Sequence, residues 1–476
     1  MFHNGSIADP AGKEGLTYMT ANLVAQGGTQ DRSYNDIQDA LYPMAAGYYA
    51  SVDKEVTIFT FSFHQDFSEQ FYPILRDVIL KPAFDESDFS RLKLNQQNYV
   101  DQVIRASSDE EYSKKALEDL LFRGSNYQHM KQGKSESVKN LTIEDVKKHY
   151  SEFFTQNNLW VGIAGNYTKD FLGRLQSDLS QLPAGTPNIP VPGKARQPKG
   201  IEVEIIAKDN AFGSAIFTGF PLNLTRRSDD FAALMVANSY LGEHRKSYSK
   251  LYQEIRQKRS MNYGDYSYIE WYENGGGNML PVPGVPRTSN YFSIWIRPVQ
   301  IAKQLQQQYE ELKNVKIGHA HFAMRMAIAE LNKLVTDGLS NEDFEATRGF
   351  LRSYTKLYVQ TPAKQLGFLM DSKFYGRENY IKELDGLLAQ MTVEDVNKAI
   401  KKYWQTENMF ITIVTDKSEA EPLAESFKEN LSSPMSYSNL VKSGLPKEVL
   451  DKDKAVQDLK LNVSSVKIVN SADTFK

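Results

Sequence analysis

The sequence predicts an α+β protein made of two tandem homologous domains, each a mostly antiparallel sheet covered by helices. Three observations lead to this prediction. Strand-like segments are followed by helix-like segments, and this order occurs twice along the chain. Two segments far apart in the chain match each other without a gap, and a stretch rich in proline and glycine separates the halves. Strands followed by helices indicate a sheet covered on one face.

The matching segments are residues 141–164 and 391–414. In both, a threonine precedes two acidic residues. This is typical of a helix start, because the hydroxyl accepts a backbone N–H and the acids suit the positive end of the helix. In both, a short connection leads to an apolar run that predicts a buried strand, at 159–164 and at 409–414. A match of this length at long period indicates an internal duplication.

The stretch between the halves predicts a linker. Residues 182–200 contain five prolines and three glycines, a composition that cannot hold regular structure. The sequence therefore divides into a first domain at 1–183, a linker at 184–199, a second domain at 200–431 and a polar C-terminal tail at 432–476. The tail contains one strand-like piece at 463–469, and we expect it to lie over a partner or over the first half.

Hydrophobic periodicity predicts the elements of each half. In the first half it predicts helices at 12–25, 33–43, 65–80, 86–106 and 109–123, and paired strands at 46–52 and 55–64. In the second half it predicts strands at 200–207, 214–221, 262–272 and 290–298, helices at 229–241 and 248–259, and a run of helices from 320 to 402. The second half thus opens with two strands that the first half lacks. If the halves are duplicates, we expect that the sequence begins late or that its start codon was misassigned, which would leave backbone groups of the first sheet unpaired.

Composition excludes several classes of function. The net charge is −3, from 56 basic and 59 acidic residues, so the chain as a whole carries no electrostatic footprint for nucleic acid. The absence of cysteine excludes disulfides, iron–sulfur clusters and thiol catalysis. No apolar run reaches the ~18 residues that a membrane-spanning helix needs. The first residues have neither the basic start nor the apolar stretch of a signal peptide.

Residues 4–29 carry a Gly-Ser-x-x-Asp opening followed by Gly-Leu. This segment resembles the insulinase/pitrilysin family of zinc peptidases, in which the opening leads into a helix with the motif His-x-x-Glu-His. Histidines at i and i+4 share one helical face and can reach a single zinc ion, and the glutamate serves as general base for the attacking water. On the matching frame this chain has Tyr18, Ala21 and Asn22. The family's third ligand is a glutamate on a later helix, and the corresponding region, 89–100, contains no acidic residue.

We therefore expect no metal in this chain. The histidines offer no replacement site. His319 and His321 are the only close pair, and residues two apart on a helix point to different sides. We expect this pair on an ordinary polar surface, and we expect the others to be structural or exposed: His3, His64, His129, His149 and His244.

The second half keeps another part of the family's site. Residues 251–268 resemble the segment on which insulinase-like enzymes carry an arginine and a tyrosine, and the resemblance places these at Arg256 and Tyr263. In the family, these groups project into the active site of the catalytic domain across the chamber. A tyrosine hydroxyl can donate to the peptide oxygen as it becomes an oxyanion, and a forked arginine can hold substrate carbonyl groups. In the alternative interpretation, Arg256 shares a solvated basic helix face with Lys258 and Arg259, and Tyr263 packs in a strand of alternating tyrosines.

The resemblance continues through 291–298 and 339–354 to the second copy of the repeat, so it covers nearly the whole chain. The glycine-rich segment 274–286 is predicted to be a mobile hairpin tip. The glycine-rich substrate loop of the family's processing proteases would lie elsewhere, near 242–249.

The leading hypothesis is a non-catalytic subunit of a two-subunit zinc peptidase. This chain would form half of a clamshell, help to enclose an acidic or polar chamber and bind peptide substrates, while a homologous catalytic subunit bearing His-x-x-Glu-His would hold the zinc. The alternative is a purely structural scaffold, like the family's core proteins in respiratory complexes. An independent enzyme with a different site is disfavoured, because no Gly-x-Ser-x-Gly, phosphate loop or dinucleotide fingerprint occurs. The family's secreted and periplasmic members favour an extracytoplasmic location, in the bacterial periplasm, over the cytoplasm.

Overall fold

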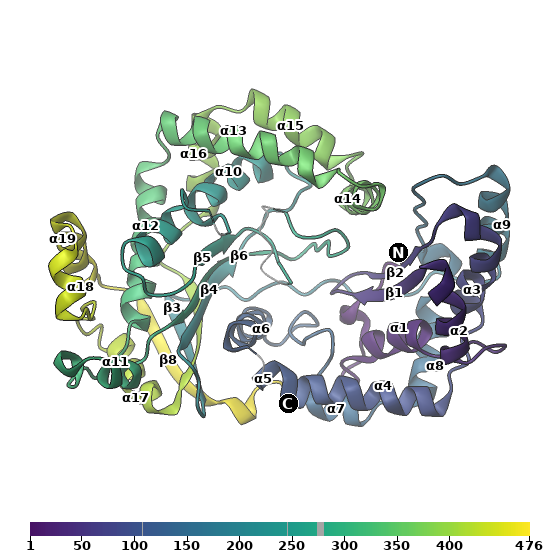
Figure 1. Ribbon diagram of the computed structural model, residues 1–476, viewed down its shortest axis with the longest axis horizontal. Helices are drawn as coiled ribbons and strands as arrows, with labels where there is room; N and C mark the ends of the chain where they lie inside the picture. Colours follow the sequence, from purple (N-terminus) through teal and green to yellow (C-terminus); the bar gives the residue numbers. More distant parts are fainter. Residues whose placement is uncertain (107, 245, 274–279) are drawn as a thin grey trace.

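The computed structural model describes all residues of the chain except 107, 245 and 274–279. Each half of the chain builds one sheet with its own helices, and the two halves lie side by side (Figure 1). The second half holds the larger sheet, with six strands, and the first half holds a sheet of two. The predicted α+β class is confirmed.

The sheet of the second half has the strand order β5-β6-β4-β7-β3-β8. Its strands are β3 (Ile201–Lys208), β4 (Ser214–Pro221), β5 (Asp265–Tyr268), β6 (Tyr291–Val299), β7 (Met409–Asp416) and β8 (Val463–Asn470). The pairs from β5 to β7 are antiparallel, whereas β3 pairs parallel with both β7 and β8. Nearly all residues of β4 and β7 are buried, which is expected for central strands covered on both faces.

One face of this sheet is covered by helices of the second half (Figure 1). The helices of this half are α10 (Asp230–Gly242), α11 (Ala302–Gln308), α12 (Ala320–Asp337), α13 (Asn341–Tyr358), α14 (Pro362–Phe374), α15 (Tyr380–Gln390), α16 (Val393–Tyr403) and α17 (Lys417–Lys428). α10 is buried almost throughout, because it lies between the sheet and the outer helices α13, α15 and α16.

The opposite face of the same sheet is covered by a helix of the first half. This helix, α6 (Asp109–Phe122), contributes Leu117 to an apolar cluster with Phe217 of β4, Trp295 of β6 and Phe410 of β7. Figure 1 shows α6 beside the sheet of the second half, with the short helix α5 (Ile104–Ala106) next to it. The linker therefore separates the two halves in the sequence, but residues from both halves pack together in one apolar cluster.

The first half contains a hairpin of β1 (Gly47–Val52) and β2 (Thr57–Ser62). Its other helices are α1 (Leu16–Gln26), α2 (Tyr34–Leu41), α3 (Ser68–Leu80), α4 (Glu86–Asn98), α5 (Ile104–Ala106), α7 (Ser135–Lys139), α8 (Ile143–Phe153) and α9 (Lys169–Leu179). α8 and α16 begin with the same capping box, formed by Thr142 with Asp145 and by Thr392 with Asp395. This shared start supports the predicted duplication.

Two predicted elements of the first half differ from the structure. The helix predicted at 86–106 is interrupted by a π-helical turn at Tyr99–Val103. The strand predicted at 159–164 is wrong, since only Leu159 forms a β-bridge, to Phe2. A strand needs a neighbouring backbone, and in the described part of the structure this segment bonds to Met1 and Phe2 through Trp160 and Leu159 alone.

The C-terminal tail belongs mainly to the second half. The strand predicted at 463–469 is β8, and the tail helices are α18 (Asn439–Gly444) and α19 (Lys447–Val456), of which α19 packs against α12. The last residues reach the first half, where Arg105 Nη2 donates to the Thr474 carbonyl at 2.6 Å. Residues 184–199 form neither helix nor strand, and the Arg196 N–H holds this linker to the Leu121 carbonyl at 2.7 Å.

The predicted mobile hairpin tip, 274–286, lies partly outside the described residues. Its described part is packed. Leu280 is buried, and the Gly284 N–H donates to the Asp371 carboxylate at 3.1 Å. The prediction is therefore wrong for 280–286, because this stretch fills the space between β2 and α14. None of the described helices combines the length and apolarity that a bilayer span requires.

Candidate functional site

Arg256 lies on a π-helical turn, Tyr252–Gln257, which is fixed from behind by a buried arginine. The Arg259 guanidinium donates to the Glu254 carboxylate at 3.1 Å and to Asp453 of α19 at 2.7 Å. The interpretation of a solvated basic face is therefore wrong for Arg259, whose side chain has no exposed surface. Its acidic partner comes from the C-terminal tail, so the local sequence carried no signal for this burial.

Tyr263 lies in the short loop between this turn and β5. Asn262 Nδ2 donates to Asp265 Oδ1 at 2.7 Å, and Asn262 Oδ1 accepts the Gly264 N–H at 3.0 Å. Gly264 has a φ of +153°, which side-chain-bearing residues rarely adopt. These contacts fix the loop with the Tyr263 side chain outward, so that 78% of its surface is exposed.

The tyrosines of this segment have different environments. The strand predicted at 262–272 is shorter in the structure, because β5 covers only Asp265–Tyr268 and excludes Tyr263. Tyr266 and Tyr268 are buried in the sheet. The packing interpretation therefore holds for these two residues and not for Tyr263.

Arg256 acts on a buried carboxyl group, that of Asp265, which follows Tyr263 by two residues. The Arg256 guanidinium lies over the Tyr252 ring, 5.0 Å from its centroid. Burial raises the pKa of Asp265 well above its usual range, although the Asn262 amide and the nearby positive charges, including Arg256, act in the opposite direction. No hydrogen bond joins Arg256 to Tyr263 in the described part of the chain. Each of the two side chains is therefore placed by its own surroundings and not by the other.

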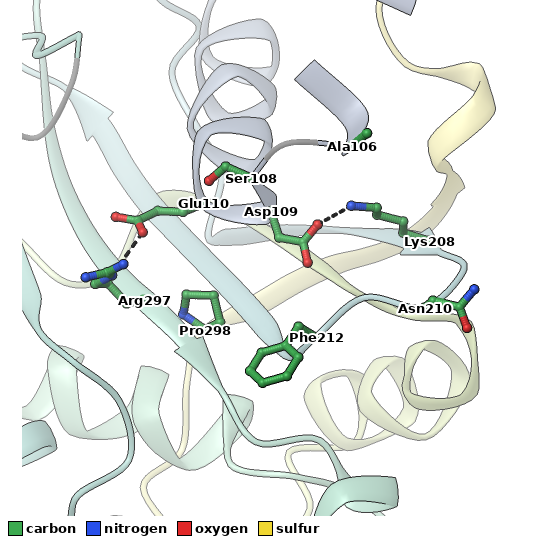
Figure 2. A pocket seen from close by; sticks show the side chains of 9 residues that line it. All are labelled: Ala106, Ser108, Asp109, Glu110, Lys208, Asn210, Phe212, Arg297 and Pro298. Atoms are coloured by element: carbon green, nitrogen blue, oxygen red, sulfur yellow. Dashed lines mark hydrogen bonds and ion pairs between the residues drawn. The ribbon is translucent and has the colours of Figure 1, made fainter. Parts of the chain in front are cut away.

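A pocket with a volume of about 320 Å³ opens near this loop, where the start of α6 meets β6 and the turn from β3 to β4 (Figure 2). Its charged lining consists of two ion pairs: Glu110 with Arg297, and Asp109 with Lys208. Phe212, in the turn, exposes 83% of its surface. The Arg297 carbonyl accepts the Asn262 amide at 3.0 Å, which connects the pocket to the Tyr263 loop. The charged side chains of the pocket are already paired with each other. A ligand would therefore meet hydrogen-bonding groups and the exposed ring of Phe212.

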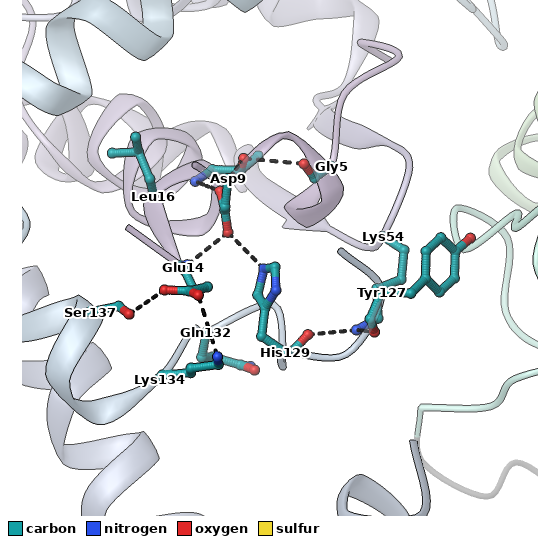
Figure 3. A network of polar contacts seen from close by, with 12 residues as sticks. Gly5, Asp9, Glu14, Leu16, Lys54, Tyr127, His129, Gln132, Lys134 and Ser137 are labelled. Atoms are coloured by element: carbon teal, nitrogen blue, oxygen red, sulfur yellow. Dashed lines mark hydrogen bonds and ion pairs between the residues drawn. The ribbon is translucent and has the colours of Figure 1, made fainter. Parts of the chain in front are cut away.

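In the first half, the start of α1 is fixed by Asp9 (Figure 3). The Asp9 carboxylate accepts the N–H groups of Gly15 and Thr17, both at 2.7 Å, and the Thr17 hydroxyl at 2.6 Å. His129 Nε2 lies 3.1 Å from the same carboxylate. An anion at this position suits the positive end of a helix. The arrangement holds the helix that carries the altered metal motif.

α1 brings Tyr18, Ala21 and Asn22 to one side of the helix. Asn22 Nδ2 donates to the Tyr18 carbonyl at 2.8 Å, and Gln26 donates to Asn22 Oδ1 at 2.7 Å. Ala21 is buried and carries no proton acceptor, and burial raises the pKa of the Tyr18 hydroxyl. A neutral phenol, a methyl group and an amide bonded within its own helix do not fit zinc.

Three side chains near Tyr18 do not follow from the resemblance to the metal motif. Tyr99, Lys131 and Glu273 lie close enough to act on the Tyr18 hydroxyl electrostatically. Lys131, which forms an ion pair with Glu273, therefore lies near Tyr18 of α1. Tyr99 falls in the region 89–100 that lacks an acid, whereas the other two come from distant segments and gave no local signal. Within the described residues, no three His, Cys, Asp or Glu side chains are grouped to hold a metal ion.

The close histidine pair is not on the surface. His319 and His321 are both buried, at the start of α12, and burial lowers their pKa values to about 4 and about 3. His321 Nδ1 lies 2.7 Å from Ser426 Oγ, and His319 Nε2 lies 3.2 Å from the Ser436 carbonyl. The expected polar surface is therefore wrong, because the tail and α17 cover this helix.

These features define a class of protein: a duplicated α+β chain whose first half carries the helix of a zinc peptidase without its metal ligands. Residues 1–130 match the family described as "Insulinase (Peptidase family M16)", and residues 140–351 match "Peptidase M16 inactive domain". The chain belongs to the insulinase family, peptidase family M16, as its resemblance implied. The relative "Non-peptidase homolog YmxG" of Helicobacter pylori is 19% identical over 421 residues, which cover 88% of each chain.

Solved structures share the fold. The peptidase M16 inactive domain from Pseudomonas fluorescens superimposes with a TM-score of 0.72 at 17% identity, covering 87% of this chain and 91% of that one. A protease from Helicobacter pylori gives a TM-score of 0.69 at 15% identity, covering 87% and 92%. Together with the altered motif, these findings support a non-catalytic member of the family.

Proposed function

We propose that this chain is the non-catalytic subunit of a heteromeric zinc metallopeptidase. It would complete the active site of a homologous catalytic subunit bearing His-x-x-Glu-His. The zinc ion would be held by that partner and would activate the attacking water, since Tyr18, Ala21 and Asn22 offer no ligand set. The two subunits would enclose extended peptides between them. The bacterial periplasm is the location that we propose.

The observation that carries this proposal is the exposure of Tyr263 on a fixed loop. A tyrosine that packs a sheet is buried, as Tyr266 and Tyr268 are, whereas Tyr263 exposes 78% of its surface. Within the described residues its hydroxyl has no hydrogen-bond partner in the protein. A hydroxyl with no partner to give up, on a loop held by its own hydrogen bonds, is suited to donate to the oxyanion of a peptide bond under attack.

Arg256 would act on the same substrate. Its guanidinium is permanently charged and can donate to two carbonyl oxygens at once. Stacking on Tyr252 directs the group without using its N–H donors. In this assignment, Arg256 holds the peptide backbone and Tyr263 stabilises the transition state.

The test combines this chain with a homologous subunit that carries His-x-x-Glu-His. Cleavage of a quenched peptide is measured for each protein alone and for the mixture, with and without a zinc chelator. We expect activity only in the mixture. Tyr263→Phe should lower kcat/KM by about 10²–10³-fold, which corresponds to about 3–4 kcal/mol, while the complex still assembles in size-exclusion chromatography.

The matched control is Tyr42→Phe, which alters a tyrosine that is 88% exposed in the first half and should leave cleavage unchanged. If the catalytic subunit alone is fully active and Tyr263→Phe changes nothing, this chain is a structural scaffold. If this chain alone shows zinc-dependent cleavage, the assignment of a non-catalytic subunit is refuted.

A further inference from the structure

Charged side chains join the C-terminal tail to the turn that carries Arg256. This turn, Tyr252–Gln257, packs against α12, and α19 of the tail packs against the same helix (Figure 1). The side chains come from the turn and the residues that follow it, from α12 and from α19. We call them the charged cluster: Glu254, Lys258, Arg259, Glu330, Lys452 and Asp453.

Glu254 is the centre of the charged cluster. It lies within the turn and is buried. Its carboxylate accepts hydrogen bonds from Lys258 at 2.7 Å and from Arg259 at 3.1 Å. Lys452 Nζ of α19 lies 3.1 Å from the same carboxylate and donates to Glu330 of α12 at 2.5 Å. Burial raises the pKa of Glu254, but its three cationic neighbours lower this pKa more, to about 2, so the cluster stays charged near neutral pH.

Asp453 closes the charged cluster from the tail. Its carboxylate accepts Arg259 Nε and the Tyr437 hydroxyl, both at 2.7 Å. The Arg259 guanidinium also donates to the Glu254 carbonyl at 2.5 Å, so it joins the backbone of the turn to the tail. Because removal of one partner from a buried ion pair is costly, these contacts fix the turn relative to α12 and α19.

Arg256 has no such contacts of its own. Within the described residues, neither a hydrogen bond nor an ion pair holds its guanidinium, which lies over the Tyr252 ring of the same turn. Its carbonyl accepts the Ser260 N–H at 2.7 Å, which is again a contact within this segment. The position of the guanidinium therefore depends on the position of the turn, and the charged cluster fixes the turn.

The Tyr263 loop is fixed in a different way. The Asn262 amide donates to Asp265 and to the Arg297 carbonyl of β6, and it accepts the Gly264 N–H. None of these groups belongs to the tail. A change in the tail should therefore displace Arg256 without displacing Tyr263, and the two effects on catalysis can be measured separately.

We infer that Asp453 and Lys452 of the tail position Arg256. Asp453 acts through Arg259, and Lys452 acts through Glu254. Both are positioning residues, since neither is part of the surface that would touch the substrate. This inference rests on the proposed function and assigns to the tail the support of its peptide-binding arginine.

The two parts of the site should respond differently to substitution. In the proposed function, Arg256 holds the peptide backbone both in the bound state and in the transition state. Its displacement should therefore raise KM and leave kcat unchanged, whereas loss of the Tyr263 hydroxyl should lower kcat.

The first test uses the complex with the homologous catalytic subunit. Asp453→Ala should raise KM for the quenched peptide by about 10-fold and change kcat by less than about 2-fold, because small displacements of substrate-positioning groups have effects of at least this size. If Asp453→Ala does not fold, Lys452→Met replaces it. This variant keeps the ion pair between Arg259 and Asp453 and should raise KM by about 3-fold.

Two substitutions in the same helix are matched controls. Asp451→Ala and Lys454→Met change side chains of the same types that are 53% and 76% exposed, and both should leave KM unchanged. An increase in KM with these controls equal to that with Asp453→Ala would overturn the inference, because the effect would then come from the helix as a whole.

A double-mutant cycle separates positioning from a general loss of stability. In an Arg256→Ala background, Asp453→Ala should change KM by less than about 2-fold further, because the group that it positions is absent. If the two effects multiply instead, Asp453 does not act through Arg256 and the inference is overturned. A fall in kcat as large as the rise in KM overturns it as well.

The second test uses this chain alone and needs no activity. The N–H groups of Lys258, Ser260 and Met261 close the turn by bonding to carbonyls of residues 253–256. In Asp453→Ala their hydrogen exchange should become about 10-fold faster, while exchange in β5 stays unchanged. Equal exchange in the wild type and the variant overturns the inference even if the complex is active. An inactive mixture of wild-type subunits refutes the proposed function, and the exchange then decides by itself whether the tail fixes the turn.

Discussion

Arg287 joins the two halves of the molecule through buried charges, and its removal is the most direct test of how they are held together. Its guanidinium donates to Asp53 at 2.6 Å and to Glu118 at 2.5 Å, and both acids belong to the first half. It also lies 4.0 Å from the centroid of the Trp271 ring. The replacement Arg287→Met keeps the length and apolar volume of the side chain but leaves two carboxylates without their shared cation.

The expected loss is large, because breaking a buried ion pair from one side leaves an uncompensated charge. Such removals cost about 3–5 kcal/mol. In the variant, Lys54 lies 3.6 Å from Glu118 and still compensates part of that negative charge. It makes no such direct contact with Asp53. We expect Arg287→Met to lower the free energy of unfolding by about 4 kcal/mol at pH 7, measured by urea denaturation.

The pH dependence gives a second readout. Burial raises the pKa of Glu118, but Lys54 and Arg287 together lower it more, to about 2. In the wild type, this acid therefore stabilises the fold above its unfolded pKa, and the contribution is lost as the pH falls towards 2. The difference in unfolding free energy between the wild type and Arg287→Met should shrink as the pH falls over the same range. The reason is that protonation of the buried carboxylates removes their uncompensated charge. A loss below 1 kcal/mol at pH 7, or a deficit independent of pH, would refute the reasoning.

Three further predictions concern helix caps and buried charged or titratable groups. Thr392→Ala removes the capping box of α16 and should cost about 1 kcal/mol of unfolding free energy, with Thr142→Ala giving a similar loss at α8; unequal losses of more than 2 kcal/mol would contradict equivalent caps. His321 is buried with its pKa lowered to about 3, so it destabilises the fold as the pH falls below 6.5; His321→Gln should flatten the decline of the thermal midpoint between pH 6.5 and 4, and an unchanged slope would argue against it. Arg259→Met should cost about 3–5 kcal/mol in urea denaturation, whereas the exposed Arg352→Met should cost less than about 0.5 kcal/mol.

Local signals in the sequence predicted much of the fold. The starts of α8 and α16 follow from a threonine and an acid three residues later. This capping box depends only on residues next to each other in the chain, so the sequence alone predicts it. β8 follows from the one strand-like piece, residues 463–469, inside a polar tail. The outward position of Tyr263 did not follow from periodicity, because it depends on the side chain of Asn262 and on the φ of Gly264.

Contacts between distant segments explain the failures. Residues 159–164 have a strand-like composition, but a strand forms only where a neighbour offers its backbone. Arg259 was interpreted as solvated because its acidic partner, Asp453, lies far along the chain. Lys131 and Glu273 were missed beside Tyr18 for the same reason, since neither lies in a segment that resembles the metal motif.

Because α6 of the first half packs on the sheet of the second half, neither half completes its own core. Residues 1–183 expressed alone would carry α6 with Leu117 and Leu121 exposed, and residues 200–476 alone would present Phe217, Trp295 and Phe410 to water. The duplicated copies are therefore no longer separable modules. A protease nick in the linker should leave the two fragments associated, and a gene fission at that position would produce two chains that fold only in each other's presence.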